Sequence, residues 1–507
     1  MSSQVVPRCH IESLPVELLS YIFTLATHDC DSEEGRAFSP ESVTLPTVLA
    51  SVNSRWRKLA ISVPTLWSTL SIDLKALVRS HPNHVFTFHQ QPFDQLSSFI
   101  TRSKHSSLDI LIDARDPKSR ELIGCMSPSS TETSQLYADC LPHLFAFLFL
   151  QMDRWRSLEV ISDTLKPLCA ALRLLSSHNP TRSGSAASRL EFIKLKRSND
   201  FYHAHAEQFL PPMELDSVPF AVLTGASDQD TIAPCHSLPK LRHVDIFGVP
   251  LNWAGFLRTL GVGHCIQSLE LSYHDRTLRP TFDQFSAIIN ACPLLRRLVI
   301  RESGPVLSQP YHRRGVVSLP MLEELHLGYV GYVETDSLIA LLSRLDAPNL
   351  VALSIEDVNP VVPRTISETG TNVENLLSYC ATGFSEHPAA VSRTSMLFPK
   401  LQRLSLNRVH ASVTAFSIFM SAFSELRDLS LLRTPNALAA LLLDADATIP
   451  RHSITSILVS PVTQPEFLKL KQLKDVGLVL TGDVEELSPS ISYPTISASH
   501  YYDWAAW

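Results

Sequence analysis

The chain has 507 residues and a formal net charge of −7, with 45% hydrophobic and 18% charged residues. This composition is typical of a folded protein, and the length leaves room for two or more domains. The negative charge argues against a nucleic-acid-binding role, which would need a basic surface. Nine cysteines without a C-x-x-C pair indicate neither a disulfide framework nor a zinc site.

Two segments bear on where the protein is found. The first ten residues, MSSQVVPRCH, lack the apolar core of a signal peptide. The longest apolar run, from Leu141 to Met152, is too short to span a bilayer. Together with the reduced state expected of the cysteines, these observations predict a location in the cytoplasm, the nucleus or both, and no membrane partner.

Residues 11–70 are predicted to form a small helical domain, behind an amino-terminal tail of residues 1–10. Pro15 suits the first position of a helix, because it needs no backbone N–H and its φ is already helical. Two apolar series with four-residue spacing share that helix: Leu14, Leu18, Ile22 and Ala26, and Pro15, Leu19 and Phe23. A second helical pattern ends at Pro64, with an apolar face made of Leu49, Val52, Trp56 and Leu59. A unit of about sixty residues barely makes its own core, so the remaining apolar surface predicts a protein partner.

This stretch resembles an F-box, the small helical domain that docks onto the Skp1-type adaptor of a cullin–RING ubiquitin ligase. The matching letters are Leu14-Pro15-x-Glu17-Leu18, Ile22-Phe23, Val52-x-x-x-Trp56-x-x-Leu59 and, as in many fungal members, Pro64-x-Leu66-Trp67. The resemblance implies an adaptor-binding set of Leu14, Pro15, Glu17, Leu18, Ile22, Phe23, Val52 and Trp56. The sequence departs from the family in a long linker from Thr27 to Pro46 and in Asn53, where many members have Cys. An ordinary amphipathic helical hairpin is the alternative interpretation.

Residues 71–150 are predicted to be a connecting segment or the first irregular repeats. The stretches LSIDL and SLDILID favour short strands, and FDQLSSFITRS between them favours a helix. Residues 116–140 are polar and predict a loop. The run LPHLFAFLFLQMDRW is apolar on all sides, which predicts a buried helix.

A repeated motif, L-x-x-L-x-L with aliphatic substitutions, dominates residues 151–480. From Leu241 onward its first residue recurs every 25 to 29 positions, except for a gap of 51 between Leu350 and Leu401 that could hold a degenerate or looped-out repeat. The clear copies begin at Trp155, Leu190, Leu241, Ile266, Leu295, Leu322, Leu350, Leu401 and Leu426, and fainter ones begin at Ile454 and Leu473.

This period lies in the range of leucine-rich repeats. Helical patterns follow the strands, and Thr281, Thr335 and Thr414 are predicted to cap three of them. No single strand–helix unit can bury its apolar edge alone, so the units must stack into a solenoid. The predicted fold class is therefore α/β, with an amino-terminal helical F-box-like domain followed by a leucine-rich-repeat solenoid with a parallel inner sheet. The usual turn Asn is missing, and a non-repetitive α/β domain is the alternative.

Three segments interrupt or follow the repeats. Residues 199–237 and 359–397 are rich in Ser, Thr, Pro, His and Ala and lack helical or strand periodicity, which predicts loops. Residues 481–507 form a polar tail that ends in YYDWAAW. Its aromatic residues predict either docking back on the solenoid or a short partner-binding motif.

The sequence offers no catalytic or cofactor motif. It has no G-x-S-x-G, G-x-x-x-x-G-K-[ST], H-E-x-x-H or dinucleotide fingerprint. The nearest approach to a metal site is His203-x-His205-x-Glu207, whose side chains would point the same way in an extended segment. It stands in a predicted loop with no second cluster to complete it, so we predict no metal, no cofactor and no enzymatic activity of the chain itself.

Two binding surfaces without a reaction centre favour a substrate receptor. The F-box-like domain would bind the adaptor, and the solenoid would hold an unknown target protein for ubiquitination by other subunits. In leucine-rich-repeat proteins the target usually lies on the inner sheet, which implies target-binding residues among Arg296, Arg297, Arg301, Glu323, Glu324, His326, Arg403 and Arg408. The alternative is a leucine-rich-repeat interaction scaffold without ligase activity.

Overall fold

The computed structural model describes residues 10–28, 43–80, 86–115, 128–176, 186–198, 218–224, 238–260, 265–306, 315–358, 372–384, 396–443, 453–460, 470 and 477–480. The segment His203–Glu207, most of the two predicted loops and the predicted tail lie outside these residues. No helix in the described parts of the chain is long and apolar enough to cross a membrane.

The chain begins with a compact helical unit, residues 10–67. After a short 3₁₀ turn, η1 (His10–Ser13), it contains α1 (Val16–His28), α2 (Leu45–Val52), α3 (Ser54–Ser62) and a final 3₁₀ turn, η4 (Pro64–Trp67). The second helical pattern in the sequence is split, because Asn53 has an extended backbone and its side chain accepts a hydrogen bond from the Trp56 N–H at 2.8 Å. Asn53 thus ends α2 and caps α3.

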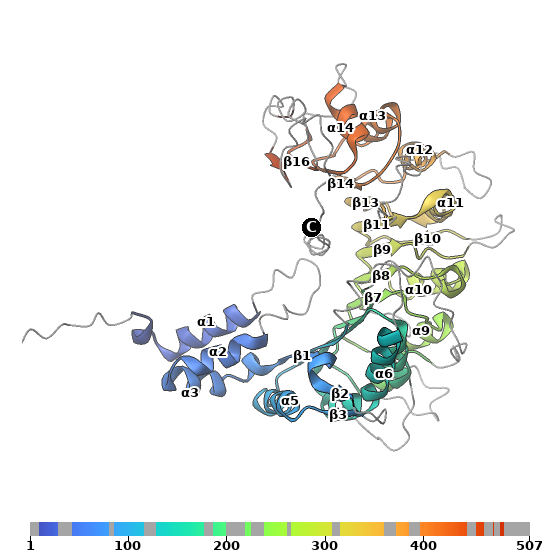
Figure 1. Ribbon diagram of the computed structural model, residues 1–507. Coiled ribbons are helices and arrows are strands. Elements are labelled where there is room, and N and C mark those ends of the chain that lie inside the picture. Colours follow the sequence, from blue (N-terminus) through green and yellow to red (C-terminus); the bar gives the residue numbers. More distant parts are fainter. Residues whose placement is uncertain are drawn as a thin grey trace, which may run out of the picture.

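A curved parallel sheet follows, with the helical unit projecting from its β1 end (Figure 1). All neighbours among its 13 strands pair in parallel and, apart from the small sheets described below, in chain order. The strands are β1 (Thr69–Asp73), β4 (Leu108–Ala114), β5 (Trp155–Ser162), β6 (Phe192–Arg197), β7 (His243–Phe247), β8 (Ser268–Ser272), β9 (Arg297–Arg301), β11 (Glu324–Tyr329), β13 (Ala352–Asp357), β14 (Arg403–Asn407), β15 (Asp428–Leu432), β16 (Ser456–Ser460) and β17 (Gly477–Leu480). The sheet therefore starts at Thr69, and the predicted connecting segment 71–150 already contributes to β1 and β4.

Helices line the outer side of the arc, so the chain is α/β (Figure 1). They are α4 (Leu74–Leu77), α5 (Gln90–Arg102), α6 (Pro128–Leu148), α7 (Leu165–Ser176), α8 (Ala221–Thr224), α9 (Trp253–Leu260), α10 (Phe282–Asn290), α11 (Gly331–Leu342), α12 (Glu374–Thr382), α13 (Val413–Ser421) and α14 (Pro435–Leu443). The outer side also holds two small sheets, β2 (Val78–Ser80) with β3 (Phe86–Phe88) and β10 (Val317–Ser318) with β12 (Leu345–Asp346). Two short 3₁₀ segments, η6 (Phe149–Arg154) and η8 (Arg276–Leu278), complete the described elements.

The predicted helix starts are only partly right. Thr281 caps α10 through a capping box with Gln284. Thr335, however, lies inside α11, and α13 is capped by Ser412 instead of Thr414. Helix α6 begins within the predicted loop 116–140, and α8 and α12 lie within the loops predicted at 199–237 and 359–397. Because β13 pairs directly with β14, the 51-residue gap holds a looped-out helix and no additional strand of the sheet.

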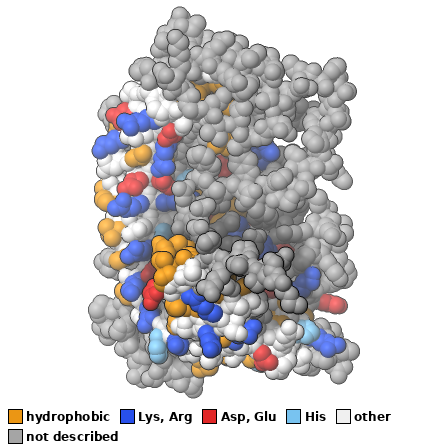
Figure 2. All heavy atoms as spheres, turned by 90° about the vertical axis from the view of Figure 1, so that its left-hand side faces the viewer, with side chains coloured by type: hydrophobic (Ala, Val, Ile, Leu, Met, Phe, Trp, Pro, Cys, Tyr) orange, Lys and Arg blue, Asp and Glu red, His pale blue; other side chains and the backbone are white. Residues whose placement is uncertain are grey.

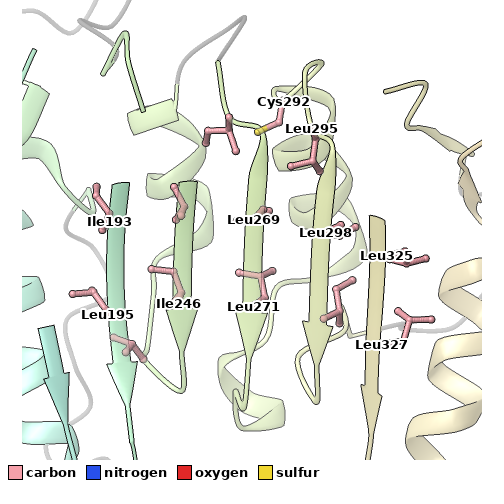
Figure 3. Close-up of a cluster of buried hydrophobic side chains, with 14 of the residues drawn as sticks. Ile193, Leu195, Ile246, Leu269, Leu271, Cys292, Leu295, Leu298, Leu325 and Leu327 are labelled. Atoms are coloured by element: carbon pink, nitrogen blue, oxygen red, sulfur yellow. The ribbon is translucent and has the colours of Figure 1, made fainter. Parts of the chain in front are cut away.

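The motif residues form the core between sheet and helices (Figure 3). Ile193, Ile246, Leu269, Leu298 and Leu325 come from successive strands, and each is at most 1% exposed. The last copy differs from its prediction: Ile457 pairs with Leu478 and Val459 with Leu480, so the motif of β17 is shifted by two residues from Leu473-Val476-Leu478.

Trp67 joins the helical unit to the sheet. Its indole N–H donates to the carbonyl oxygen of Ala60 at 2.7 Å, and its ring packs edge-on against Phe99 at 4.9 Å. Trp67, Leu70 and Ile72 also have the spacing of the repeat motif and are all buried. Trp67 thus ends the helical unit and supplies the first core residue of the sheet, so one apolar core runs from Leu19 to Leu470.

The turns that follow several strands bury a polar residue three positions after the last motif residue. Ser198 donates to Asp163 in one neighbouring pair of turns. In another, the backbone N–H of His274 donates to Ser303 Oγ at 3.0 Å, and His274 Nδ1 lies 2.9 Å from the same oxygen. These contacts link neighbouring turns through buried polar side chains.

His274 is expected to make the fold acid-sensitive. Burial, aided by the positive charge of Arg279, lowers the pKa of His274 to about 3, whereas an unfolded histidine titrates near about 6.5. Below pH 6.5 the unfolded chain therefore binds a proton that the folded chain rejects, so stability falls as the pH drops from 6.5 towards 3. The substitution His274→Asn should recover about 2 kcal/mol of the stability lost between pH 7 and pH 5. Urea unfolding of both proteins at the two pH values measures this difference, and equal losses in both would contradict it.

Candidate protein-binding surfaces

Helix α1 has two apolar faces with opposite surroundings. Leu19 and Phe23 point inward and are at most 1% exposed. The outward series is largely open to solvent, with Leu18 51% and Ile22 41% exposed. We call this outward series the α1 stripe; it consists of Val16, Leu18, Tyr21, Ile22 and Leu25.

Exposed apolar side chains are concentrated in the helical unit. Of the seventeen exposed large hydrophobic side chains among the described residues, nine lie between Ile11 and Ile61. Val48 and Val52 on α2 and Ile61 on α3 add to the α1 stripe. Figure 2 shows hydrophobic side chains gathered over this projecting unit, with Lys and Arg side chains below them. Solvent-exposed apolar patches of this kind mark protein-interaction sites.

The predicted adaptor-binding residues divide by burial. Pro15, Glu17, Leu18, Ile22 and Val52 are exposed, whereas Leu14 and Trp56 are half-buried. Phe23 differs from the expectation, because it is only 1% exposed and its ring packs against Trp56 at 4.9 Å. Phe23 therefore belongs to the core of the helical unit. Tyr21 and Leu25, which lie on the exposed face, are additions that the family letters do not include.

The inner face of the sheet carries a network of ion pairs centred on Glu324. Its carboxylate lies 2.7 Å from Arg403, 3.6 Å from Arg297 and 3.9 Å from His326. His326 and the hydrogen bond from Arg403 hold the pKa of Glu324 at about 2, although partial burial opposes them. Glu324 therefore stays charged over the whole physiological range and fixes the three side chains around it.

Arg301 links this region to the neighbouring strands. Its guanidinium contacts the buried Glu270 and lies 3.6 Å from Glu356. Asn407 donates to Glu356 at 2.9 Å. Four strands, β8, β9, β13 and β14, are thereby tied together through polar side chains on one face.

Most of the predicted target-binding residues are thus already paired within the chain. Arg296 and Glu323 form a separate pair at 2.8 Å, outside the network. Arg408 lies in the turn after β14, with a φ of 56°. A target that used these charges would have to compete with internal partners. The sequence could not show this, because the pairing residues stand as far as 79 positions apart.

The missing side chain of Gly328 leaves room for the side chain of Arg301, which belongs to this network. It lies on β11 beside Arg301, and a Cβ there would come within 2.8 Å of Val358 and 2.9 Å of Arg301. Gly328→Ala should therefore destabilise the fold by about 1–3 kcal/mol through overpacking. Thermal denaturation followed by circular dichroism tests this. Gly315→Ala is the control because a Cβ at Gly315 meets nothing within 4 Å; equal melting temperatures of the two variants would contradict the prediction.

Two observations on the described residues bear on metal binding and on thiol chemistry. They hold no group of three or more His, Cys, Asp or Glu side chains placed to bind a metal ion. Burial raises the pKa of the Cys140, Cys292 and Cys380 thiols to about 12. Thiols with such pKa values are protonated at neutral pH and are poor nucleophiles.

Comparison with protein-family models finds no match for the chain, and a search of curated proteins finds no matching sequence. The interpretation of the two surfaces therefore rests on residue pattern and geometry.

Proposed function

We propose that the chain is the substrate-receptor subunit of a cullin–RING ubiquitin ligase of the F-box type, with a leucine-rich-repeat solenoid. The observation that carries this proposal is the exposed α1 stripe on a unit whose other apolar series is already buried. The leucine–proline start and the apolar spacing of that unit resemble the adaptor-binding surface of an F-box. The helical unit would dock on a Skp1-type adaptor, and the solenoid would hold the target.

The energetics of the α1 stripe suit a protein partner. Burying an exposed Leu or Ile contributes about 1.5–3 kcal/mol, and the stripe offers five large side chains. Association has its own cost in lost translational and rotational freedom, of about 4–15 kcal/mol. The stripe can cover much of that cost, and the neighbouring exposed residues Val48 and Val52 would add to the contact.

The mechanism would be tethering. A target held on the solenoid meets the ubiquitin-charged enzyme as an intramolecular partner, at a high effective concentration. The chemistry would belong to other subunits. The Trp67 joint supports this role, because a continuous core between the two binding parts holds them in a fixed relation.

Co-purification tests the proposal. The full chain, expressed together with a Skp1-type adaptor, should elute with it as a one-to-one complex on size exclusion. A folded chain that elutes without the adaptor would overturn the proposal. Elution of the chain alone as a dimer would instead favour the scaffold alternative, in which the α1 stripe mediates self-association.

A further inference from the structure

One edge of the sheet carries four basic side chains for which the described residues provide no ion pair with a carboxylate. Lys104 lies in the turn before β4, Arg189 precedes β6, and Lys240 and Arg242 precede β7. All four therefore stand at the amino-terminal ends of parallel strands, which meet at one edge. Lys104, Lys240 and Arg242 are exposed and Arg189 is half-buried. We call these four residues the basic edge.

Hydrogen bonds make the basic edge continuous. The Arg189 guanidinium donates to the carbonyl oxygen of His105, next to Lys104, at 3.0 Å. The carbonyl oxygen of Glu191, two residues beyond Arg189, accepts from the backbone N–H of Arg242 at 2.8 Å. Lys240 is two residues before Arg242. The four side chains thus follow the sheet edge from β4 to β7.

Other basic residues of this edge have carboxylate partners. Arg156 pairs with Asp109, Arg296 with Glu323 and Arg297 with Glu324. In the described part of the chain, none of the four basic-edge residues forms an ion pair with a carboxylate. The negative charge of Glu191 lies among them, where it acts on Arg156 and His243. Asp153, before β5, also lies near Arg189, since both charges act on Arg154. Four positive charges therefore gather near two acidic side chains, in a chain whose net charge is −7.

The positive charges of Arg242 and Arg189 also contribute to lowering the pKa values of two neighbouring groups, His243 and Arg154. Burial is the main cause of the lowered pKa of His243, and the charges of Arg242 and Arg297 lower it further. Burial also lowers the pKa of Arg154, with a contribution from the charge of Arg189 that opposes the effect of Asp153. Charged side chains of both signs recur along the left-hand margin of the face in Figure 2.

We propose that the basic edge binds an acidic segment of the target protein. Adjacent strands lie about 4.8 Å apart, so β4 to β7 span about 14 Å. An extended peptide rises about 3.3 Å per residue, and five residues with acidic side chains would cover that length. A nucleic acid would favour a longer uniform strip with aromatic stacking platforms, whereas the basic edge is short and includes Glu191. The inference rests on the proposed function, since it names the chemistry of the target.

Fluorescence anisotropy with the full chain tests this inference. The probes are three labelled peptides of one length: one rich in Asp and Glu, one with phosphoserines in place of the acidic residues, and one with Asn and Gln. The anionic peptides should bind and the neutral one should not, with weaker binding at higher salt because exposed charges are screened. The stronger of the two anionic peptides identifies carboxylate or phosphate as the source of the charge. The double variant Lys240→Gln/Arg242→Gln should weaken binding about tenfold.

A matched control lies five and six strands away from β7 in the sheet. Lys400 and Arg427 occupy the same motif positions before β14 and β15 as Lys240 and Arg242 do before β7. Lys400→Gln/Arg427→Gln should leave peptide binding unchanged. Equal loss in both double variants, no binding of either anionic peptide, or tighter binding of a single-stranded RNA of the same charge would each overturn the inference. Adaptor co-purification on the same proteins separates this result from a failure of the proposed function.

Discussion

Replacing Leu18 and Ile22 together with aspartate should abolish adaptor binding and leave the chain folded. Both side chains are exposed, Leu18 by 51% and Ile22 by 41%, and neither belongs to the buried core. Burying either side chain in a complex would contribute about 2 kcal/mol to the free energy of binding. Losing both contributions lowers the affinity by about a thousandfold. Burying two carboxylates without partners would add to that loss. Co-purification and calorimetric titration with the adaptor measure the effect, and circular dichroism reports the folded state.

The control is an equally exposed apolar residue elsewhere. Ile418 on α13 is 52% exposed, and Ile418→Asp should not change adaptor affinity. By contrast, Leu19→Asp should unfold the helical unit, since Leu19 is fully buried. A folded Leu18→Asp/Ile22→Asp protein that binds the adaptor with the affinity of the original chain would remove the ligase proposal.

Trp67→Ala should lower the free energy of unfolding by about 3–5 kcal/mol, as large-to-small core changes of an aromatic residue do. The indole is fully buried, and Arg102 lies 4.4 Å above its ring. Its removal leaves a cavity between α3 and α5 and deletes the hydrogen bond that the indole donates to the carbonyl oxygen of Ala60. Chemical denaturation measures the loss, and hydrogen exchange should show that the helical unit opens more readily than the strands beyond β5.

Trp67→Phe is the comparison that separates packing from hydrogen bonding. It keeps an aromatic ring against Phe99 but gives up the bond to Ala60, so it should lose less than half as much stability as Trp67→Ala. If Trp67→Ala unfolds at the same denaturant concentration as the original chain, the helical unit and the sheet do not share a core.

The repeat could be predicted because strand burial imposes a spacing on the sequence. Leu269 and Leu271 must point to the same side of β8 (Figure 3), and the same requirement repeats in every strand of a stacked sheet. The prediction missed the register of β17, since Leu473, Val476 and Leu478 satisfy the same spacing two residues early. It also missed the first repeat, which begins at Trp67, because Trp67 was assigned to the end of the helical domain.

The candidate surfaces were less predictable, because they depend on which way side chains point. The sequence places Leu18 and Phe23 equally well on an apolar helix face, and only packing against Trp56 shows that Phe23 is internal. Likewise, the charges of the inner face look free in the sequence, whereas Glu324 lies within reach of Arg297, His326 and Arg403. The basic edge can be recognised only when the ion pairs of the other charged residues along the sheet are known from the structure.

The direct pairing of β13 with β14 across a 51-residue interval has a practical consequence. The sheet accommodates a long connection between these two strands, because their register is set by the pairing of Leu353 with Leu404 and not by the length of chain between them. The entropy of closing a loop grows only slowly with its length. A fluorescent reporter or affinity tag spliced between Val358 and Asn372 should therefore leave both halves of the arc assembled, which would let the protein be followed in cells with both its ends unaltered.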